Sequence, residues 1–181
     1  MDFSLSNEQR SWQMQARKFA QEEIKPISLD LDEAPDAHGT FNWDIVEKGS
    51  KLGFRTLAVP KEYGGEGTDY VTQALVMAEL ARGDSAISKT FSQNWKWSHL
   101  ISQACNPEQK ERFLPRIASG ELRLQSMGVT EPTTGTDTTK IRTTAVRRGD
   151  RYVINGQKVW ISRVQHSDLM ILLARTTPAD R

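Results

Sequence analysis

The chain has 181 residues, of which 26% are charged and 37% hydrophobic, and this composition is typical of a folded globular protein. Its 24 basic residues are balanced by 23 acidic ones, so the net charge is +1 and no basic surface for nucleic acid is expected. A single cysteine, Cys105, excludes a disulfide framework and a multi-cysteine metal site, and it fits a reducing compartment.

The N-terminal segment carries acidic residues early and lacks an apolar run, which argues against a secretory or transit peptide. No stretch is long and apolar enough to cross a membrane. We therefore expect a cytoplasmic protein. The three histidines have no spacing typical of metal ligands, so no metal site is predicted.

The first half of the sequence has apolar residues at helical spacing. A first helix is predicted to begin at Glu8, after a cap at Ser6 or Asn7, and to stop at Pro26. Residues 29–40 are predicted to form a surface loop. Four more helices are predicted, and Asp84 or Ser85 caps the third of these. Their approximate ranges are 43–52, 70–82, 85–105 and 108–118.

After Gly120 the apolar spacing changes from helical to alternating. A turn is predicted at 148–150, and Asn155-Gly156 is the dipeptide most typical of a tight hairpin. The last strand is almost entirely apolar, as expected for burial on both faces. The predicted strands are 122–129, 141–147, 152–154, 158–162 and 169–174. The pattern predicts an α+β protein with an all-α domain at 1–121 and a β domain at 122–181.

Two short segments carry candidate chemistry. At 129–137 a predicted strand end meets a proline-fixed turn with several hydroxyls and a glycine, a composition suited to phosphates or a polar ring edge but also common in ordinary loops. In the predicted strand 158–162, Trp160 and Ser162 share one face while Ile161 points to the other. An indole beside a hydroxyl can hold a flat heterocycle, or it can be a core tryptophan beside a solvated serine.

Taken together, the segments Thr130–Asp137 and 149–162 carry the patterns TEPxxG[ST]D and GDxYxxNGxKxWI[ST]. These patterns resemble the flavin-binding signature of the acyl-CoA dehydrogenase family, and the helical half resembles family landmarks in the same order. The resemblance implies an N-terminal all-α domain followed by a partial antiparallel β-barrel domain. It also implies that the family's C-terminal helical bundle is absent from this chain.

The resemblance further implies roles for single residues. Met127, Val129 and Thr130 would line the flavin of FAD, and Thr136 would contact both the cofactor region and the phosphate arm of CoA. Trp160 would pack beside the flavin ring, with Ile161 in the same cofactor-binding segment and Ser162 at the polar edge of the ring. The helix with Phe91 and Trp95 would border the acyl pocket, although an aromatic stripe at this spacing also fits a core.

The implied reaction is α,β-desaturation of an acyl-CoA, with removal of the α-proton and transfer of the β-hydride to flavin N5. The resemblance places the catalytic base beyond this chain and gives Glu131 a structural role. The implied electron acceptor is an electron-transferring flavoprotein, and the full-length protein is expected to be a homodimer or homotetramer. Two alternatives stay open: an acyl-CoA oxidase or flavin monooxygenase of the same fold, and a non-catalytic binding or interaction fragment.

Overall fold

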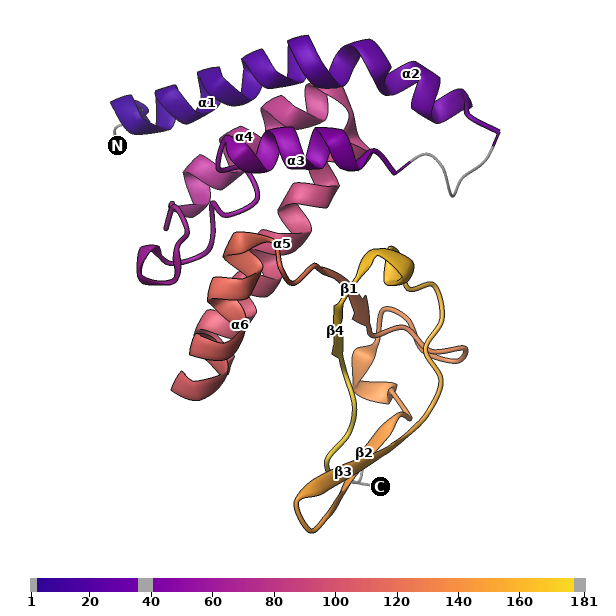
Figure 1. Ribbon diagram of the computed structural model, residues 1–181. Helices are drawn as coiled ribbons and strands as arrows, with labels where there is room; N and C mark the ends of the chain where they lie inside the picture. Colours follow the sequence, from indigo (N-terminus) through magenta and orange to yellow (C-terminus); the bar gives the residue numbers. More distant parts are fainter. Residues whose placement is uncertain (1–2, 36–40, 178–181) are drawn as a thin grey trace. The chain divides into compact units, whose positions relative to one another are not determined.

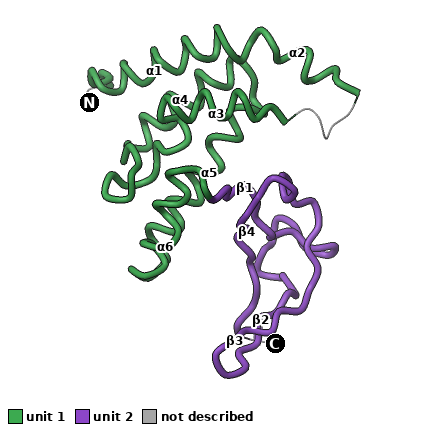
Figure 2. The backbone as a smooth tube through the Cα atoms, in the orientation of Figure 1, with its two compact units in different colours: residues 1–121 green, residues 122–181 purple. Residues whose placement is uncertain are grey.

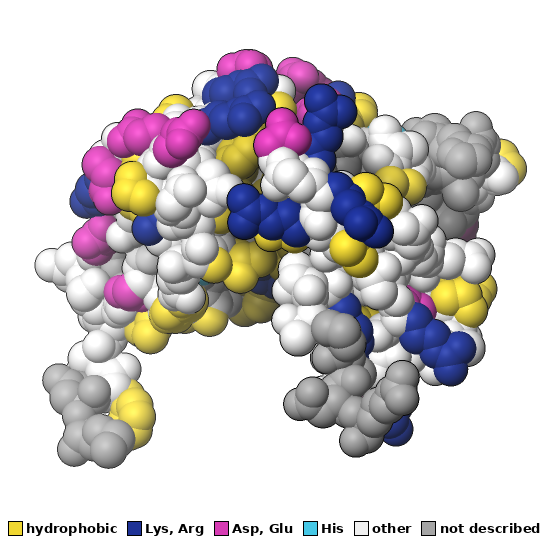
Figure 3. Space-filling view, turned by 90° about the horizontal axis from the view of Figure 1, so that it is seen from below, with side chains coloured by type: hydrophobic (Ala, Val, Ile, Leu, Met, Phe, Trp, Pro, Cys, Tyr) yellow, Lys and Arg dark blue, Asp and Glu magenta, His cyan; other side chains and the backbone are white. Residues whose placement is uncertain are grey.

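The computed structural model describes residues 3–35 and 41–177. Two compact units follow each other along the chain, a helical unit at 1–121 and a smaller unit with strands at 122–181 (Figures 1 and 2). Side chains of both charge signs are visible in Figure 3. Within the described ranges, no helix combines the length and apolar character that crossing a membrane requires.

The described residues of the helical unit form six α-helices, a π turn and a short 3-10 turn at Lys61–Tyr63. In Figure 1, α1, the π turn and α2 follow one another as a single long rod that lies across α4. The bounds are α1 Asn7–Phe19, the π turn Ala20–Ile24, α2 Lys25–Glu33, α3 Trp43–Lys51, α4 Tyr70–Gly83, α5 Ser85–Ala104 and α6 Pro107–Ser119.

Polar side chains cap the starts of α1 and α5, as the sequence predicts. The Ser6 hydroxyl accepts from the Gln9 N–H at 3.1 Å, and the Gln9 side chain accepts from the Ser6 N–H at 3.0 Å. The Asp84 carboxylate accepts from the N–H groups of Ala86 and Ile87 at 2.8 and 2.9 Å. Each cap satisfies backbone donors that a helix start leaves free.

The prediction that Pro26 stops the first helix is wrong. The π turn Ala20–Ile24 precedes it, and the Lys25 N–H donates to the Ala20 carbonyl, five residues back. Pro26 then occupies the first turn of α2, a position where proline is favoured. The predicted loop at 29–40 is therefore helical as far as Glu33. Residues 36–40 lie outside the described residues.

Aromatic side chains from three segments form the core of the helical unit. The Phe54 ring lies 5.4 Å from that of Phe19 and 6.2 Å from that of Phe91. The buried Trp95 indole donates to the Phe54 carbonyl at 2.6 Å, which ties α5 to the segment after α3. Burial of these rings is the main term that holds the helices together.

Up to residue 177, where the description ends, the second unit contains four short strands in two sheets. β1 Leu124–Gly128 pairs in parallel with β4 Leu169–Leu172, and β2 Thr144–Arg148 pairs antiparallel with β3 Arg151–Asn155. The predicted turn between β2 and β3 is confirmed at Gly149, whose φ of 63° suits a two-residue hairpin. The expected antiparallel barrel is not confirmed, because in the described part of this unit there are two two-stranded sheets, neither is closed and one is parallel.

Three strand predictions are wrong. Asn155-Gly156 forms no hairpin turn, because Gly156 is instead in close approach to Thr143, whose Cα would lie 2.6 Å from an added Cβ. Residues 158–162 form no strand, so the alternation expected there does not apply. β4 is not buried on both faces: Met170 is 43% exposed, since β4 pairs only with β1 among the described strands.

Candidate functional site

A buried ion pair joins the segment after β1 to the segment after β3. The Lys158 ammonium lies 2.9 Å from a Glu131 carboxylate oxygen, and the two side chains are 8% and 4% exposed. Lys158 also donates to the Val129 carbonyl at 2.9 Å. Because an ion pair out of water tolerates little displacement, these contacts fix the position of Val129 relative to Lys158.

The Glu131 carboxylate also organises the segment before β2. It accepts from the backbone N–H groups of Arg142 at 2.6 Å and Thr143 at 2.9 Å. The Thr143 side chain, the Lys158 ammonium and these N–H groups favour the ionised form, so they lower the pKa of Glu131 far below its ordinary value. A carboxylate held this way is a poor proton acceptor, which agrees with a structural role.

Thr130 lies between Val129 and Glu131, which both contact Lys158. It also contacts the segment that contains Trp160. The Val159 N–H donates to the Thr130 carbonyl at 2.9 Å, so the residue before Trp160 is held beside Thr130. Thr130 is half-buried, whereas the Trp160 side chain is 89% exposed. The structure therefore brings Thr130 and Trp160 into one neighbourhood and leaves the indole open to a ligand.

The backbone at Trp160 is unusual. Its φ is 59°, a left-handed conformation that is a genuine outlier for a bulky residue and costs about 1–2 kcal/mol. Arg163 has a similar φ of 58°. Two left-handed residues in this short stretch break the pleat of a strand, which is the physical reason that Trp160 and Ser162 do not alternate as predicted. Strain of this kind concentrates at functional sites.

The other predicted cofactor residues lie close in sequence to Glu131 or Lys158. Met127 pairs with Ile171 in the β1–β4 sheet and is half-buried, as is Val129 just beyond the strand. Ile161 is half-buried next to Trp160, and Ser162 is exposed. The structure thus places all of these residues in the second unit, close in sequence to the two anchored segments.

Thr136 lies in an exposed loop that starts with a tight turn. The Glu131 N–H donates to the Thr134 carbonyl at 2.8 Å, and the Thr134 N–H donates back to Glu131 at 3.1 Å. The Asp137 carboxylate then accepts from the Thr139 N–H at 3.2 Å. The loop with Thr136 is therefore closed at its start by backbone hydrogen bonds and followed by a side-chain cap.

Phe91 and Trp95, the predicted substrate residues, lie in the helical unit. They are 1% and 4% exposed and belong to its aromatic core. Their contact with a substrate stays a prediction.

The sequence analysis did not predict that Lys158 pairs with Glu131. Lys158 is the lysine of the pattern GDxYxxNGxKxWI[ST], so its place in that pattern was a signal that could have been used. Within the residues that the structure describes, no cluster of His, Cys, Asp and Glu could hold a metal ion.

Two family models match the chain in the order that this architecture requires. The N-terminal domain of acyl-CoA dehydrogenases matches residues 6–121, and the middle domain of acyl-CoA dehydrogenases matches residues 126–181. The chain belongs to the acyl-CoA dehydrogenase family. A short-chain specific acyl-CoA dehydrogenase from Clostridium acetobutylicum is 34% identical over 97% of this chain and 45% of its own length.

Solved acyl-CoA dehydrogenase structures share the fold of this chain. Butyryl-CoA dehydrogenase from Megasphaera elsdenii is 28% identical, with a TM-score of 0.86 over 98% of this chain and 46% of that chain. A glutaryl-CoA dehydrogenase from Mycobacterium smegmatis, in complex with FADH2, is also 28% identical, with a TM-score of 0.84 over 95% of this chain and 43% of that chain. The chain therefore spans less than half the length of these relatives.

Proposed function

We propose that the protein is an FAD-dependent acyl-CoA dehydrogenase. In this proposal, residues 1–121 are its N-terminal helical domain and residues 122–181 begin a larger antiparallel middle β domain. The observation that carries the proposal is the conformation of Trp160. This tryptophan is 89% exposed, has a left-handed backbone and follows closely after Lys158 of the buried ion pair. An exposed indole in a strained position has no stabilising role in the described chain, and it offers a flat apolar face to a flat ring.

The residues of this segment fit a flavin. The hydrogen bond from Val159 to Thr130 keeps a hydroxyl-bearing side chain near the indole, so both can address one planar ligand. FAD, when bound, supplies the hydride acceptor. Thr130 and Ser162 would donate to the polar edge of the ring, where such donors stabilise the negative charge of the reduced form. Met127, Val129 and Ile161 would supply apolar contact beside them.

The proposed reaction is removal of the α-proton and β-hydride of an acyl-CoA thioester. Thr136, exposed on its loop, would contact the CoA portion, and Phe91 and Trp95 would shape the acyl end from the helical core. No residue of this chain is proposed as the base that removes the α-proton. Electrons would pass to an electron-transferring flavoprotein, and the whole protein would act as a homodimer or homotetramer.

The test begins with the visible spectrum of the purified whole protein. A flavin spectrum that acyl-CoA thioesters of graded length bleach is expected, and Trp160→Ala and Thr130→Ala should each lower FAD retention. Reduction of an electron-transferring flavoprotein without peroxide would support a dehydrogenase, whereas peroxide formation would indicate an oxidase. A folded protein that stays colourless after incubation with FAD would sink the proposal.

A further inference from the structure

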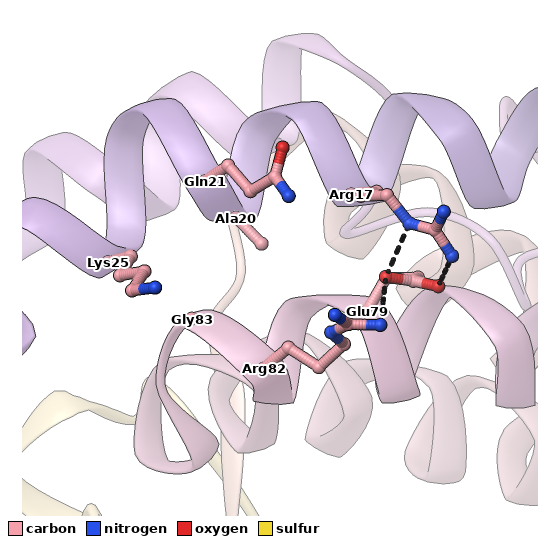
Figure 4. A pocket seen from close by; sticks show the side chains of 7 residues that line it. All are labelled: Arg17, Ala20, Gln21, Lys25, Glu79, Arg82 and Gly83. Atoms are coloured by element: carbon pink, nitrogen blue, oxygen red, sulfur yellow. Dashed lines mark hydrogen bonds and ion pairs between the residues drawn. The ribbon is translucent and has the colours of Figure 1, made fainter.

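A small pocket lies in the helical unit where the π turn meets the end of α4. Its lining residues are Arg17, Ala20, Gln21, Lys25, Glu79, Arg82 and Gly83 (Figure 4). Gly83 allows the end of α4 to lie close to the π turn. An added Cβ at this position would lie 2.9 Å from the Ile24 Cβ and 3.0 Å from the Ala20 carbonyl oxygen. π turns inside helices are frequent at functional sites, and the side chains that line this pocket are mostly charged.

The single carboxylate of the pocket is already engaged. The Glu79 side chain is 5% exposed and accepts from Arg17 Nη2 at 2.6 Å and Arg17 Nε at 3.1 Å, and from the Gln13 amide at 3.2 Å. The hydrogen bonds from Arg17 are the main reason that the pKa of Glu79 is below its ordinary value. Glu79 therefore stays ionised, and its charge is balanced mainly by Arg17, with a longer ion pair to Arg82 at 3.9 Å.

Two further cations, Arg82 and Lys25, line the pocket, and only Arg82 pairs with a carboxylate among the described residues. The nearest Arg82 nitrogen is 3.9 Å from Glu79, and Lys25 forms no ion pair with any residue that the structure describes. An adjoining pocket shares Lys25 and Arg82 and also contains Asp32 and Asp84. Both Asp84 oxygens are occupied, by the α5 cap and by the Ser28 hydroxyl at 2.7 Å. The first pocket thus holds three cationic side chains and one neutralised carboxylate.

We propose that this pocket binds a small oxyanion of the size of inorganic phosphate. Lys25 and Arg82 would supply the charge, and the Gln21 amide, also on the lining, would donate a hydrogen bond (Figure 4). An oxyanion accepts hydrogen bonds and carries the charge that this donor-rich lining lacks. The inference concerns the helical unit alone and does not rest on the proposed flavin chemistry.

The test is a titration with inorganic phosphate at constant ionic strength, with chloride as the replaced ion. Backbone amide shifts of Ala20, Gln21 and Gly83 in ¹H–¹⁵N NMR spectra should saturate. Lys25→Gln and Arg82→Gln should each weaken binding about three- to tenfold, as expected for the loss of one partly exposed charge contact. Arg82→Lys, which keeps the charge, should lose less affinity than Arg82→Gln.

Lys18→Gln is the matched control. It removes the same charge from the same helical rod, but Lys18 is exposed and does not line the pocket. Its affinity for phosphate should stay within about twofold of the unchanged protein, the level expected for distant screened charges. Shifts that do not saturate, or an equal loss in Lys18→Gln and Lys25→Gln, would overturn the proposal, because either result indicates general screening.

Discussion

At the scale of single residues, the buried pair of Glu131 and Lys158 determines the geometry of the candidate site. Lys158→Met keeps the length of the side chain but leaves a buried carboxylate without its cation. The free energy of unfolding is expected to fall by about 3–5 kcal/mol, which urea denaturation measures. Arg116→Met, which breaks an exposed pair with Glu121, is the control and should have a far smaller effect. Equal losses of unfolding free energy in the two variants would show that burial of the Glu131–Lys158 pair does not increase its contribution to stability.

Trp160 should show a trade-off between stability and ligand binding. Trp160→Gly removes the cost of a left-handed φ but adds chain entropy to the unfolded state, so stability is expected to stay equal or to rise by up to ~1 kcal/mol. FAD retention should fall in the same variant, since the flat face is lost. Trp160→Phe should retain more FAD. A variant that is destabilised and still binds FAD normally would contradict the assigned role.

Asp168 gives a prediction on pH. It accepts from Arg123 Nε at 2.9 Å, from Nη2 at 3.0 Å and from the Arg123 N–H at 2.8 Å, and these bonds lower its pKa to about 2. Since the folded pKa is depressed, the stabilisation is present above the unfolded pKa near 4 and is lost as the pH falls toward 2. Asp168→Asn should flatten the unfolding free energy between pH 4 and pH 2.

Asp150→Asn, in the exposed hairpin turn, is the control for Asp168→Asn, because it removes a charge without breaking that contact with Arg123. If both variants gave the same slope of stability against pH, the assigned ion pair would not be its cause.

Residue patterns predicted the helix caps but not the conformation at Trp160. A left-handed φ is normally signalled by glycine or asparagine, and a tryptophan gives no such signal. Asn155-Gly156 failed for the opposite reason. Its glycine is needed for the close approach to Thr143, and a sequence does not distinguish that need from a hairpin turn.

At the scale of elements, the contact of α4 with the π turn depends on Gly83. Gly83→Ala would place a methyl group 2.9 Å from the Ile24 Cβ, so the two elements must separate. A loss of about 1–3 kcal/mol is expected despite the better helix propensity of alanine, measured by thermal unfolding. Gly135→Ala is the matched control, because no atom lies within 4 Å of its added Cβ. A stabilised Gly83→Ala variant would refute the close contact.

Helices were predicted better than strands for a physical reason. A helix closes its hydrogen bonds locally, so caps such as Asp84 and apolar spacing define most of it. Strand partners come from elsewhere: β1 pairs with β4, about forty residues further along the chain, and no local signal encodes that pairing or its parallel direction. The π turn was missed because Pro26 has the same appearance in a sequence whether a helix ends or restarts there.

At the scale of the whole molecule, the chain covers 45% of a relative that it matches over 97% of its own length. Glu131 has a pKa far below that of a useful base, and no other present residue is assigned to α-proton removal. The 181-residue chain is therefore expected to bind FAD weakly and to show no acyl-CoA-dependent dye reduction. Robust turnover by this chain would place the base within it and overturn that assignment.

The π turn has one more consequence. One residue corresponds to about 100° of rotation around a helix axis. The extra residue in the π turn therefore rotates the side chains of α2 around the helix axis relative to those of α1. Deleting one position between Ala20 and Ile24 would turn the rod into an uninterrupted α-helix. Arg17 and Lys25 would then point in different directions although the charges of both are kept. The anion pocket is thus encoded by chain length as much as by residue type.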